Sequence, residues 1–182
     1  MTDGTLYGAG DCGIILIPQS NKERRIWRPQ AKTYARIGHL ALTIDVDPDY
    51  RAESVLGAIQ YMHHEPNVRR LLLIGASTGG KAALEANVEA KSGLVDGTVA
   101  MSANGGEEDA SDLQGRLLIM ISDDEHPKYV RVGHELAENA PEPKELQTYP
   151  GEAHARALVV GKHGAAVRRR LKTFVSNVCT TT

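Results

Sequence analysis

The sequence predicts an α/β protein with three layers, α/β/α, in which a mostly parallel sheet of about six strands lies between helices. Short aliphatic runs alternate with longer stretches of helical period, as expected for the crossover connections of a parallel sheet. The run over residues 70–74 is almost entirely aliphatic, which favours a central strand covered on both faces. A length of 182 residues suits one unit, so we expect a single domain over residues 1–182.

Each expected element follows from the spacing of its apolar residues. Six short runs predict strands, at residues 13–17, 40–45, 70–74, 97–102, 116–121 and 144–149. Helical spacing predicts helices at residues 27–35, 53–63, 81–91, 129–140 and 167–178. The run 144–149 alternates like a strand nearer an edge. Phe and Trp occur once each, so we expect an aliphatic core.

Composition and charge exclude several kinds of partner. The formal net charge of −2 lacks the positive field that a dedicated nucleic-acid or acidic-membrane binder requires. The longest aliphatic run, residues 14–17, is far too short to span a bilayer, and residues 1–4 lack the charged and apolar regions of a signal peptide. We therefore expect a cytoplasmic protein that binds neither nucleic acid nor membrane. The sequence leaves open whether it forms a homodimer.

The two cysteines, Cys12 and Cys179, lie near opposite ends of the chain. The simplest interpretation is two reduced thiols, as in cytosolic proteins. The sequence leaves a disulfide between them open but offers nothing to support it. The sequence contains no cluster of His, Cys and carboxylate residues with the spacing of metal ligands. The nearest candidate, residues 63–65, is a helix end followed by Pro66. We therefore expect no metal site.

The loop after the aliphatic run 70–74 carries the clearest motif. It reads Gly75-Ala76-Ser77-Thr78-Gly79-Gly80, a Gly-x-Ser-x-Gly pattern between a strand and a helix. In such a nucleophile elbow a sharp turn projects the serine hydroxyl above the sheet, and the glycines remove side chains that would collide. The start of the helix then offers backbone N–H groups to an oxyanion.

The same loop permits two other interpretations. Residues 75–81 also match the start of a phosphate-binding loop, and Asp123 and Asp124 follow an aliphatic run as in a magnesium site. Ala82 stands against this interpretation, because a phosphate-binding loop needs a Ser or Thr hydroxyl there for Mg²⁺. Alternatively, the glycines only allow a strand to turn into a helix. We favour the nucleophile elbow.

A serine nucleophile needs a base, and the base needs an orienting acid; elbow hydrolases supply them in the order Ser, acid, His. Residues 122–125, Ser-Asp-Asp-Glu, follow one strand and supply candidate acids. Among the seven histidines, only His154 follows the last strand in a loop that contains glycine. We therefore expect His154 to be the base.

With these motifs in this order, the chain resembles the α/β-hydrolase superfamily, in particular its small esterase-like and dienelactone-hydrolase-like members. The resemblance covers roughly residues 13–178. It rests on five segments: Gly-Ala-Ser-Thr-Gly-Gly at 75–80, Val-Asp-Gly-Thr-Val-Ala-Met-Ser at 95–102, Ile-Ser-Asp-Asp-Glu at 121–125, Pro-Glu-Pro-Lys-Glu-Leu at 141–146 and Tyr-Pro-Gly-Glu-Ala-His at 149–154. It implies a minimal form of that fold, in which the usual leading antiparallel strands are absent.

The resemblance also implies a role for each site residue. Ser77 is the expected nucleophile and His154 the base, and the acid lies within residues 123–125. The strand register favours Glu125, whereas a shift of one residue favours Asp124. The expected oxyanion hole combines the N–H of Thr78 with an N–H from the loop after the strand 13–17. Because Pro18 has no N–H, the second donor would be Gln19 or Ser20.

Together these observations predict a serine hydrolase that cleaves small carboxylic esters or thioesters through an acyl-enzyme on Ser77, without a cofactor. Only about a dozen residues separate the strand ending at Ser102 from the one starting at Arg116, where many relatives insert a helical lid. The expected site is therefore open. The first alternative is a non-catalytic α/β-hydrolase-like protein that binds a small molecule, and the next is a P-loop-like nucleotide binder.

Overall fold

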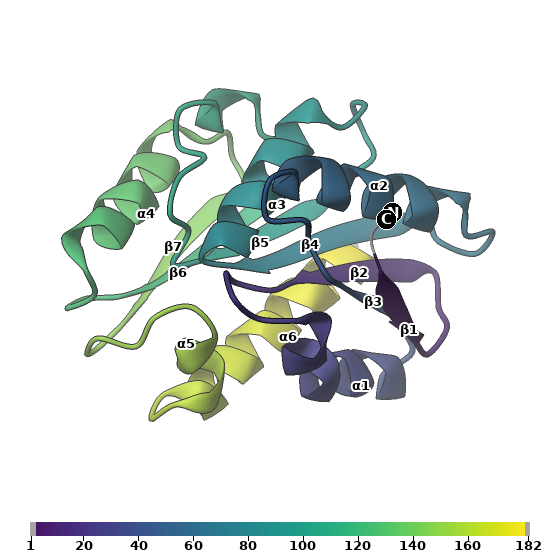
Figure 1. Ribbon diagram of the computed structural model, residues 1–182, viewed down its shortest axis with the longest axis horizontal. Helices are drawn as coiled ribbons and strands as arrows, with labels where there is room; N and C mark the ends of the chain where they lie inside the picture. Colours follow the sequence, from purple (N-terminus) through teal and green to yellow (C-terminus); the bar gives the residue numbers. More distant parts are fainter. Residues whose placement is uncertain (1–2, 181–182) are drawn as a thin grey trace.

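The structure, a computed structural model, describes residues 3–180 and confirms the three-layer α/β/α architecture. Figure 1 shows the sheet between two layers of helices. The strands are β1 (Gly4–Tyr7), β2 (Cys12–Ile17), β3 (Leu40–Ile44), β4 (Arg70–Ala76), β5 (Gly97–Met101), β6 (Arg116–Ser122) and β7 (Lys144–Tyr149). The helices are α1 (Arg28–Arg36), α2 (Arg51–His64), α3 (Thr78–Glu89), α4 (Pro127–Asn139), α5 (Arg156–Val160) and α6 (Gly164–Thr180), with short 3-10 turns at Arg24–Trp27 and Ala110–Asp112.

The described sheet has seven strands in the order β1-β3-β2-β4-β5-β6-β7. The six predicted strands are all present and parallel to one another. The prediction that no antiparallel strand leads the fold was wrong, because β1 pairs antiparallel with β3. This strand has four residues, only one of them aliphatic, and lies half exposed at the edge of the sheet. Such a short and weakly apolar segment has no clear strand period in the sequence.

Apolar side chains fill the space on both faces of the sheet. On one face, side chains from α1, α5 and α6 join residues of the central strands in one cluster. On the other face, α2 and α3 cover β2, β3 and β4, while α3 and α4 cover β5 and β6. Both β2 and the aliphatic part of β4 are fully buried, as expected for central parallel strands.

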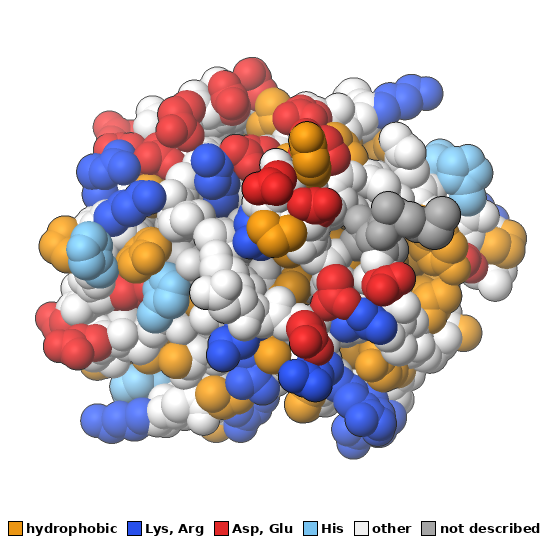
Figure 2. Space-filling model, in the orientation of Figure 1, with side chains coloured by type: hydrophobic (Ala, Val, Ile, Leu, Met, Phe, Trp, Pro, Cys, Tyr) orange, Lys and Arg blue, Asp and Glu red, His pale blue; other side chains and the backbone are white. Residues whose placement is uncertain are grey.

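Charged side chains of both signs lie on the surface, and some of each sign lie among those of the other (Figure 2). On the face shown in Figure 2, acidic side chains gather toward the upper edge, where α3 and α4 lie, and basic side chains toward the lower edge, where α1 and α6 lie. The basic side chains of α6 include residues 168–170 and Lys172. None of the described helices combines the length and the apolar character needed to cross a bilayer.

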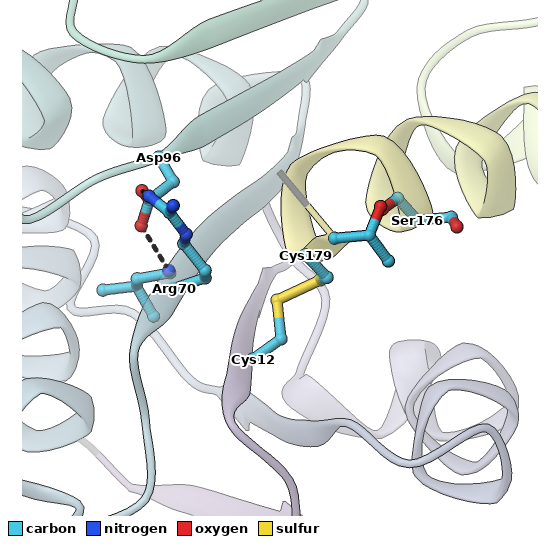
Figure 3. The surroundings of a disulfide bond; sticks show 7 residues. Cys12, Arg70, Asp96, Ser176 and Cys179 are labelled. Atoms are coloured by element: carbon cyan, nitrogen blue, oxygen red, sulfur yellow. Dashed lines mark hydrogen bonds and ion pairs between the residues drawn. A yellow bond between two sulfur atoms is a disulfide. The ribbon is translucent and has the colours of Figure 1, made fainter. Parts of the chain in front are cut away.

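The two cysteines form a disulfide, so the prediction of two reduced thiols was wrong (Figure 3). Cys12 opens β2 and Cys179 lies in the last turn of α6. Their Cα atoms are 5.6 Å apart, although the two residues are separated by 167 positions in sequence. Packing of α6 against the central strands brings Cys179 beside Cys12, and no local pattern encodes that contact. A cytoplasmic location, where disulfides are rare, stays a prediction.

Candidate active site

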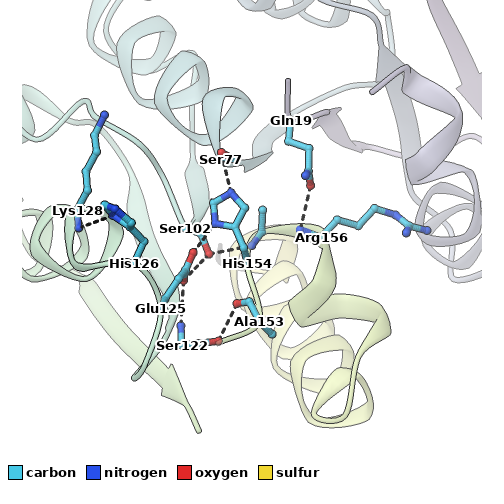
Figure 4. Close-up of polar contacts among 11 residues, drawn as sticks. Gln19, Ser77, Ser102, Ser122, Glu125, His126, Lys128, Ala153, His154 and Arg156 are labelled. Atoms are coloured by element: carbon cyan, nitrogen blue, oxygen red, sulfur yellow. Dashed lines mark hydrogen bonds and ion pairs between the residues drawn. The ribbon is translucent and has the colours of Figure 1, made fainter. Parts of the chain in front are cut away.

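The candidate site lies at the carboxyl edge of the parallel strands, where ligands bind in open α/β sheets. Ser77 follows β4, Glu125 follows β6 and His154 follows β7. Figure 4 shows the three side chains in a row, with Ser77 on one side of the His154 ring and Glu125 on the other. In sequence, Ser77 lies 77 positions and Glu125 lies 29 positions before His154. The three residues meet because their strands end at the same edge of the sheet.

The turn at Ser77 has the backbone strain of a nucleophile elbow. Ser77 has φ 53° and ψ −117°, a region that residues other than glycine seldom occupy. A Cβ at Gly75 would lie 2.2 Å from the carbonyl oxygen of Gly79, and a Cβ at Gly79 would lie 2.5 Å from the carbonyl oxygen of Pro18. Glycine at both positions therefore lets the strand, the turn and α3 approach this closely.

Hydrogen bonds connect Ser77, His154 and Glu125. The Ser77 Oγ lies 3.0 Å from the Nε2 of His154, and the Nδ1 of His154 bonds to the Oε1 of Glu125. When the neutral ring carries its proton on Nδ1, it donates to the carboxylate and accepts from the serine hydroxyl. This tautomer leaves Nε2 free to take the serine proton.

Glu125 is held in place by several donors. Its side chain is 2% exposed, and its Oε2 accepts from the Ser102 hydroxyl at 2.9 Å and from the backbone N–H of Ser122 at 3.3 Å. Ser102 in turn accepts from the N–H of Ala155, the residue after His154, at 2.9 Å. Buried carboxylates need such partners. The sequence prediction omitted Ser102, although its place at the end of the strand between β4 and β6 could have indicated it.

Asp124 does not join this group. Asp123 and Asp124 are exposed, and their backbone N–H groups donate to the carbonyl oxygens of Tyr149 and Gly151. These two bonds connect the acidic loop to the loop that carries His154. Of the two carboxylates that the sequence left open, the structure brings Glu125 to the histidine and leaves Asp124 in solvent.

The residues expected to supply the oxyanion donors belong to the start of α3 and to the loop after β2. Thr78 opens α3, so its N–H is among the first four of the helix, which have no intrahelical acceptor. The Ser20 hydroxyl donates to the Thr78 Oγ1 at 2.9 Å, which connects the loop after β2 to the elbow. The side chain of Gln19 accepts from the N–H of Arg156 at 3.2 Å (Figure 4). The structure thus gathers Gln19, Ser20 and Thr78 beside the serine.

Tyr129, which the sequence prediction also omitted, covers part of the His154 ring. The two ring centroids lie 4.4 Å apart at an interplanar angle of 39°. Tyr129 belongs to the first turn of α4, and the sequence predicts only that it begins the helix over residues 129–140. Its half-exposed ring lies where it can limit the rotation of the histidine.

A surface hollow adjoins the elbow at Thr78, and its lining is mostly polar. Residues that line it include Asp49, Arg51, Thr78, Lys81, Glu85 and Asn104. Lys81 forms an ion pair with Glu85 one turn along α3, with 3.4 Å between Nζ and Oε1. The Oδ1 of Asn104 is buried and accepts no hydrogen bond from the described residues.

The sheet order and the strand–elbow–helix unit at Ser77 define an α/β-hydrolase fold, and comparison with solved structures places the chain in that fold class. A dienelactone hydrolase from Anabaena variabilis superposes with a TM-score of 0.82 at 18% identity, over 97% of this chain and 91% of that one. A monoacylglycerol lipase from Paleococcus ferrophilus superposes with a TM-score of 0.84 at 10% identity, over 98% of this chain and 99% of the lipase. Est1E from Butyrivibrio proteoclasticus superposes with a TM-score of 0.80 at 15% identity, over 99% of this chain and 95% of Est1E.

Comparison by sequence gives no relative. No protein-family model matches the chain, and no curated protein matches it. The likeness at 10–18% identity therefore establishes the fold that these chains share.

Proposed function

We propose that this chain is a serine hydrolase that cleaves small carboxylic esters or thioesters. The observation that carries the proposal is the continuous hydrogen-bonded row of Ser77, His154 and buried Glu125 on a strained elbow. The names of the similar structures, a dienelactone hydrolase and a monoacylglycerol lipase, support ester hydrolysis as the class of reaction.

In the proposed reaction the Ser77 hydroxyl attacks the substrate carbonyl while His154 takes its proton. Glu125 holds the tautomer of the ring and stabilises the imidazolium that forms. His154 then protonates the leaving alcohol or thiol, which departs and leaves an acyl group on Ser77. Water, activated by the same histidine, releases the acid and restores the serine. These steps use no cofactor.

The proposed oxyanion hole combines the N–H of Thr78 with that of Gln19 or Ser20. Its support is the short distance between the loop after β2 and the elbow, given by the bond from Ser20 to Thr78. The start of α3 adds its positive dipole end on the same side of Ser77. Because the tetrahedral oxyanion gains charge during attack, such donors stabilise it more than the ground-state carbonyl.

A fluorophosphonate probe tests the proposal, because it reacts covalently with an activated serine. We expect intact-mass analysis to find one adduct on the parent protein and none on Ser77→Ala. Turnover of p-nitrophenyl acetate should fall at least about 10³-fold in that variant, since the nucleophile is lost. Ser176→Ala, which removes an exposed hydroxyl of α6, is the matched control and should react like the parent.

Two other results would contradict the proposed hydrolase and favour a different function. A folded parent that neither reacts with the probe nor turns over the ester would contradict the hydrolase and favour a non-catalytic small-molecule binding protein. Thermal stabilisation by ATP with magnesium, without labelling, would favour the nucleotide binder.

A further inference from the structure

The disulfide belongs to a cluster of possible metal ligands outside the candidate active site. Among residues 3–180, Cys12, His39 and Cys179 form a group whose ligand atoms all lie within 4.8 Å of one another. Cys12 begins β2 and His39 precedes β3, so the cluster lies at the amino edge of the sheet. Ser77, by contrast, follows the carboxyl end of β4. The cluster is therefore separate from the proposed hydrolase site.

Strand register and helix packing hold the three residues together. Gly13 on β2 is paired with Leu40 on β3 in a parallel ladder, so the preceding residues, Cys12 and His39, lie side by side. Cys179 approaches from the last turn of α6, as Figure 3 shows for its bond to Cys12. Strand β2, helix α6 and the turn before β3 thus supply the three side chains.

The histidine of this cluster has an unsatisfied polar atom. The Nδ1 of His39 is buried and forms no hydrogen bond with any residue of the range 3–180. A buried polar atom without a partner costs free energy, so its retention calls for an explanation. An imidazole beside two sulfur atoms is also a frequent part of zinc sites.

We propose that reduction of the Cys12–Cys179 disulfide converts this cluster into a three-ligand site for Zn²⁺ or a similar thiophilic divalent cation. A dithiol reductant supplies two electrons and two protons, becomes a disulfide itself, and leaves two thiols on the protein. The cation then displaces both thiol protons and binds two thiolates and the imidazole of His39. The two thiolates balance the charge of the cation.

The positions of Cys12, His39 and Cys179 are close to those that a tetrahedral zinc site requires. Tetrahedral zinc with Zn–S near 2.3 Å and Zn–N near 2.0 Å puts its ligand atoms roughly 3.5–3.8 Å apart. In the present structure the ligand atoms lie within 4.8 Å of one another, and the two cysteine Cα atoms lie 5.6 Å apart. After reduction the two sulfur atoms must separate, and the imidazole nitrogen and the sulfur atoms must approach one another by up to about 1 Å. Because Cys179 and His39 are only half-buried, solvent can reach the fourth position.

The cation would preserve a connection that reduction removes. In the oxidised protein the disulfide joins the last helix to a central strand. In the reduced protein a cation held by Cys12 and Cys179 would join the same two elements and add His39 at the start of β3. One pair of cysteines would thus stabilise the fold in both oxidising and reducing surroundings, through different chemistry.

Cobalt serves as the spectroscopic probe, because tetrahedral thiolate–Co²⁺ complexes absorb strongly in the near ultraviolet and visible ranges. The full chain is reduced, freed of metal with a chelator, and titrated with Co²⁺ without oxygen. We expect one equivalent to bind with a thiolate charge-transfer band, and Zn²⁺ to bleach it. The oxidised protein should show no such band. The His39→Ala variant should bind Co²⁺ at least about tenfold more weakly, since one of three ligands is lost.

The matched control is His134→Ala, which removes an exposed histidine of α4 on the opposite face of the sheet. It should bind Co²⁺ like the parent. A reduced protein that keeps its circular dichroism but shows no charge-transfer band would overturn the proposal, and so would equal affinity in His39→Ala. If reduction unfolds the chain, Zn²⁺ should restore the native dichroism of the parent, and failure to do so also overturns it. None of these readouts depends on ester hydrolysis.

Discussion

At the scale of single residues, burial distinguishes carboxylates that are neighbours in sequence. Asp123, Asp124 and Glu125 stand in one short loop, yet only Glu125 turns inward, to a position where its side chain is 2% exposed. Both of its carboxylate oxygens form hydrogen bonds, one with His154 and the other with the Ser102 hydroxyl and the N–H of Ser122. A buried carboxylate with this many hydrogen-bond donors is held in one orientation.

We therefore expect Glu125→Gln to lower kcat/KM for p-nitrophenyl acetate by roughly 10²- to 10⁴-fold, because an amide can favour the wrong tautomer of His154. Asp124→Asn, a matched change one residue away, should stay within about twofold of the parent, since the Asp124 side chain lies in solvent. Steady-state kinetics of the two variants measure the difference. Equal losses in both, or a larger loss in Asp124→Asn, would contradict the assignment of Glu125.

At the scale of elements, the unit of β4, the elbow and α3 sets the position of the serine. The unusual φ of Ser77 persists because close backbone contacts surround it. Those contacts require glycine at position 75, where an added Cβ would meet the backbone of Gly79 at 2.2 and 2.6 Å. Gly57, in the middle of α2, has no atom within 4 Å of an added Cβ.

Gly75→Ala should therefore move the elbow. We expect a loss of about 1–3 kcal/mol in the free energy of unfolding and a fall of about 10²-fold in kcat/KM, because a displacement near 1 Å spoils the attack geometry. Denaturant unfolding and ester kinetics check both numbers.

Gly57→Ala provides the control. It should raise the free energy of unfolding by about 0.5–1 kcal/mol, since alanine suits a helix interior better than glycine, and should leave turnover unchanged. A Gly75→Ala protein as stable and active as the parent would contradict the tight elbow.

At the scale of the whole molecule, the chain builds its sheet and helices with little additional structure over the site. The connection from β5 to β6 holds only a short 3-10 turn, Ala110–Asp112, and the length of this connection in the sequence predicts no lid there. His154 has a side chain that is 32% exposed, and the hollow beside Thr78 is mostly polar. Such a site offers little apolar surface to a long acyl chain.

We expect the chain to hydrolyse p-nitrophenyl acetate and butyrate with kcat/KM at least about tenfold higher than the laurate ester. A long acyl chain gains affinity only by burying methylene groups, at about 0.8 kcal/mol each, and this surface buries few of them. A series of esters measured below their critical micelle concentrations gives the comparison. A rate that rises steadily with chain length would contradict an open, polar site.

Local sequence patterns predicted most of the strands and two of the candidate site residues. The period of the apolar residues predicted six of the seven described strands, and the motif at residues 75–80 together with the order Ser, acid, His indicated Ser77 and His154. These features can be predicted from the sequence because a strand, a helix and a sharp turn each depend on residues that are close together in the chain.

Tertiary structure alone decided the remaining points. It placed Glu125 rather than Asp124 against His154, added Ser102 and Tyr129 around these residues, and joined Cys12 to Cys179, which lie 167 positions apart in sequence. These contacts depend on which strands are neighbours, in what register, and on where the last helix packs. The free energy of burying both faces of the sheet determines that arrangement, and it is a property of the whole chain rather than of any segment.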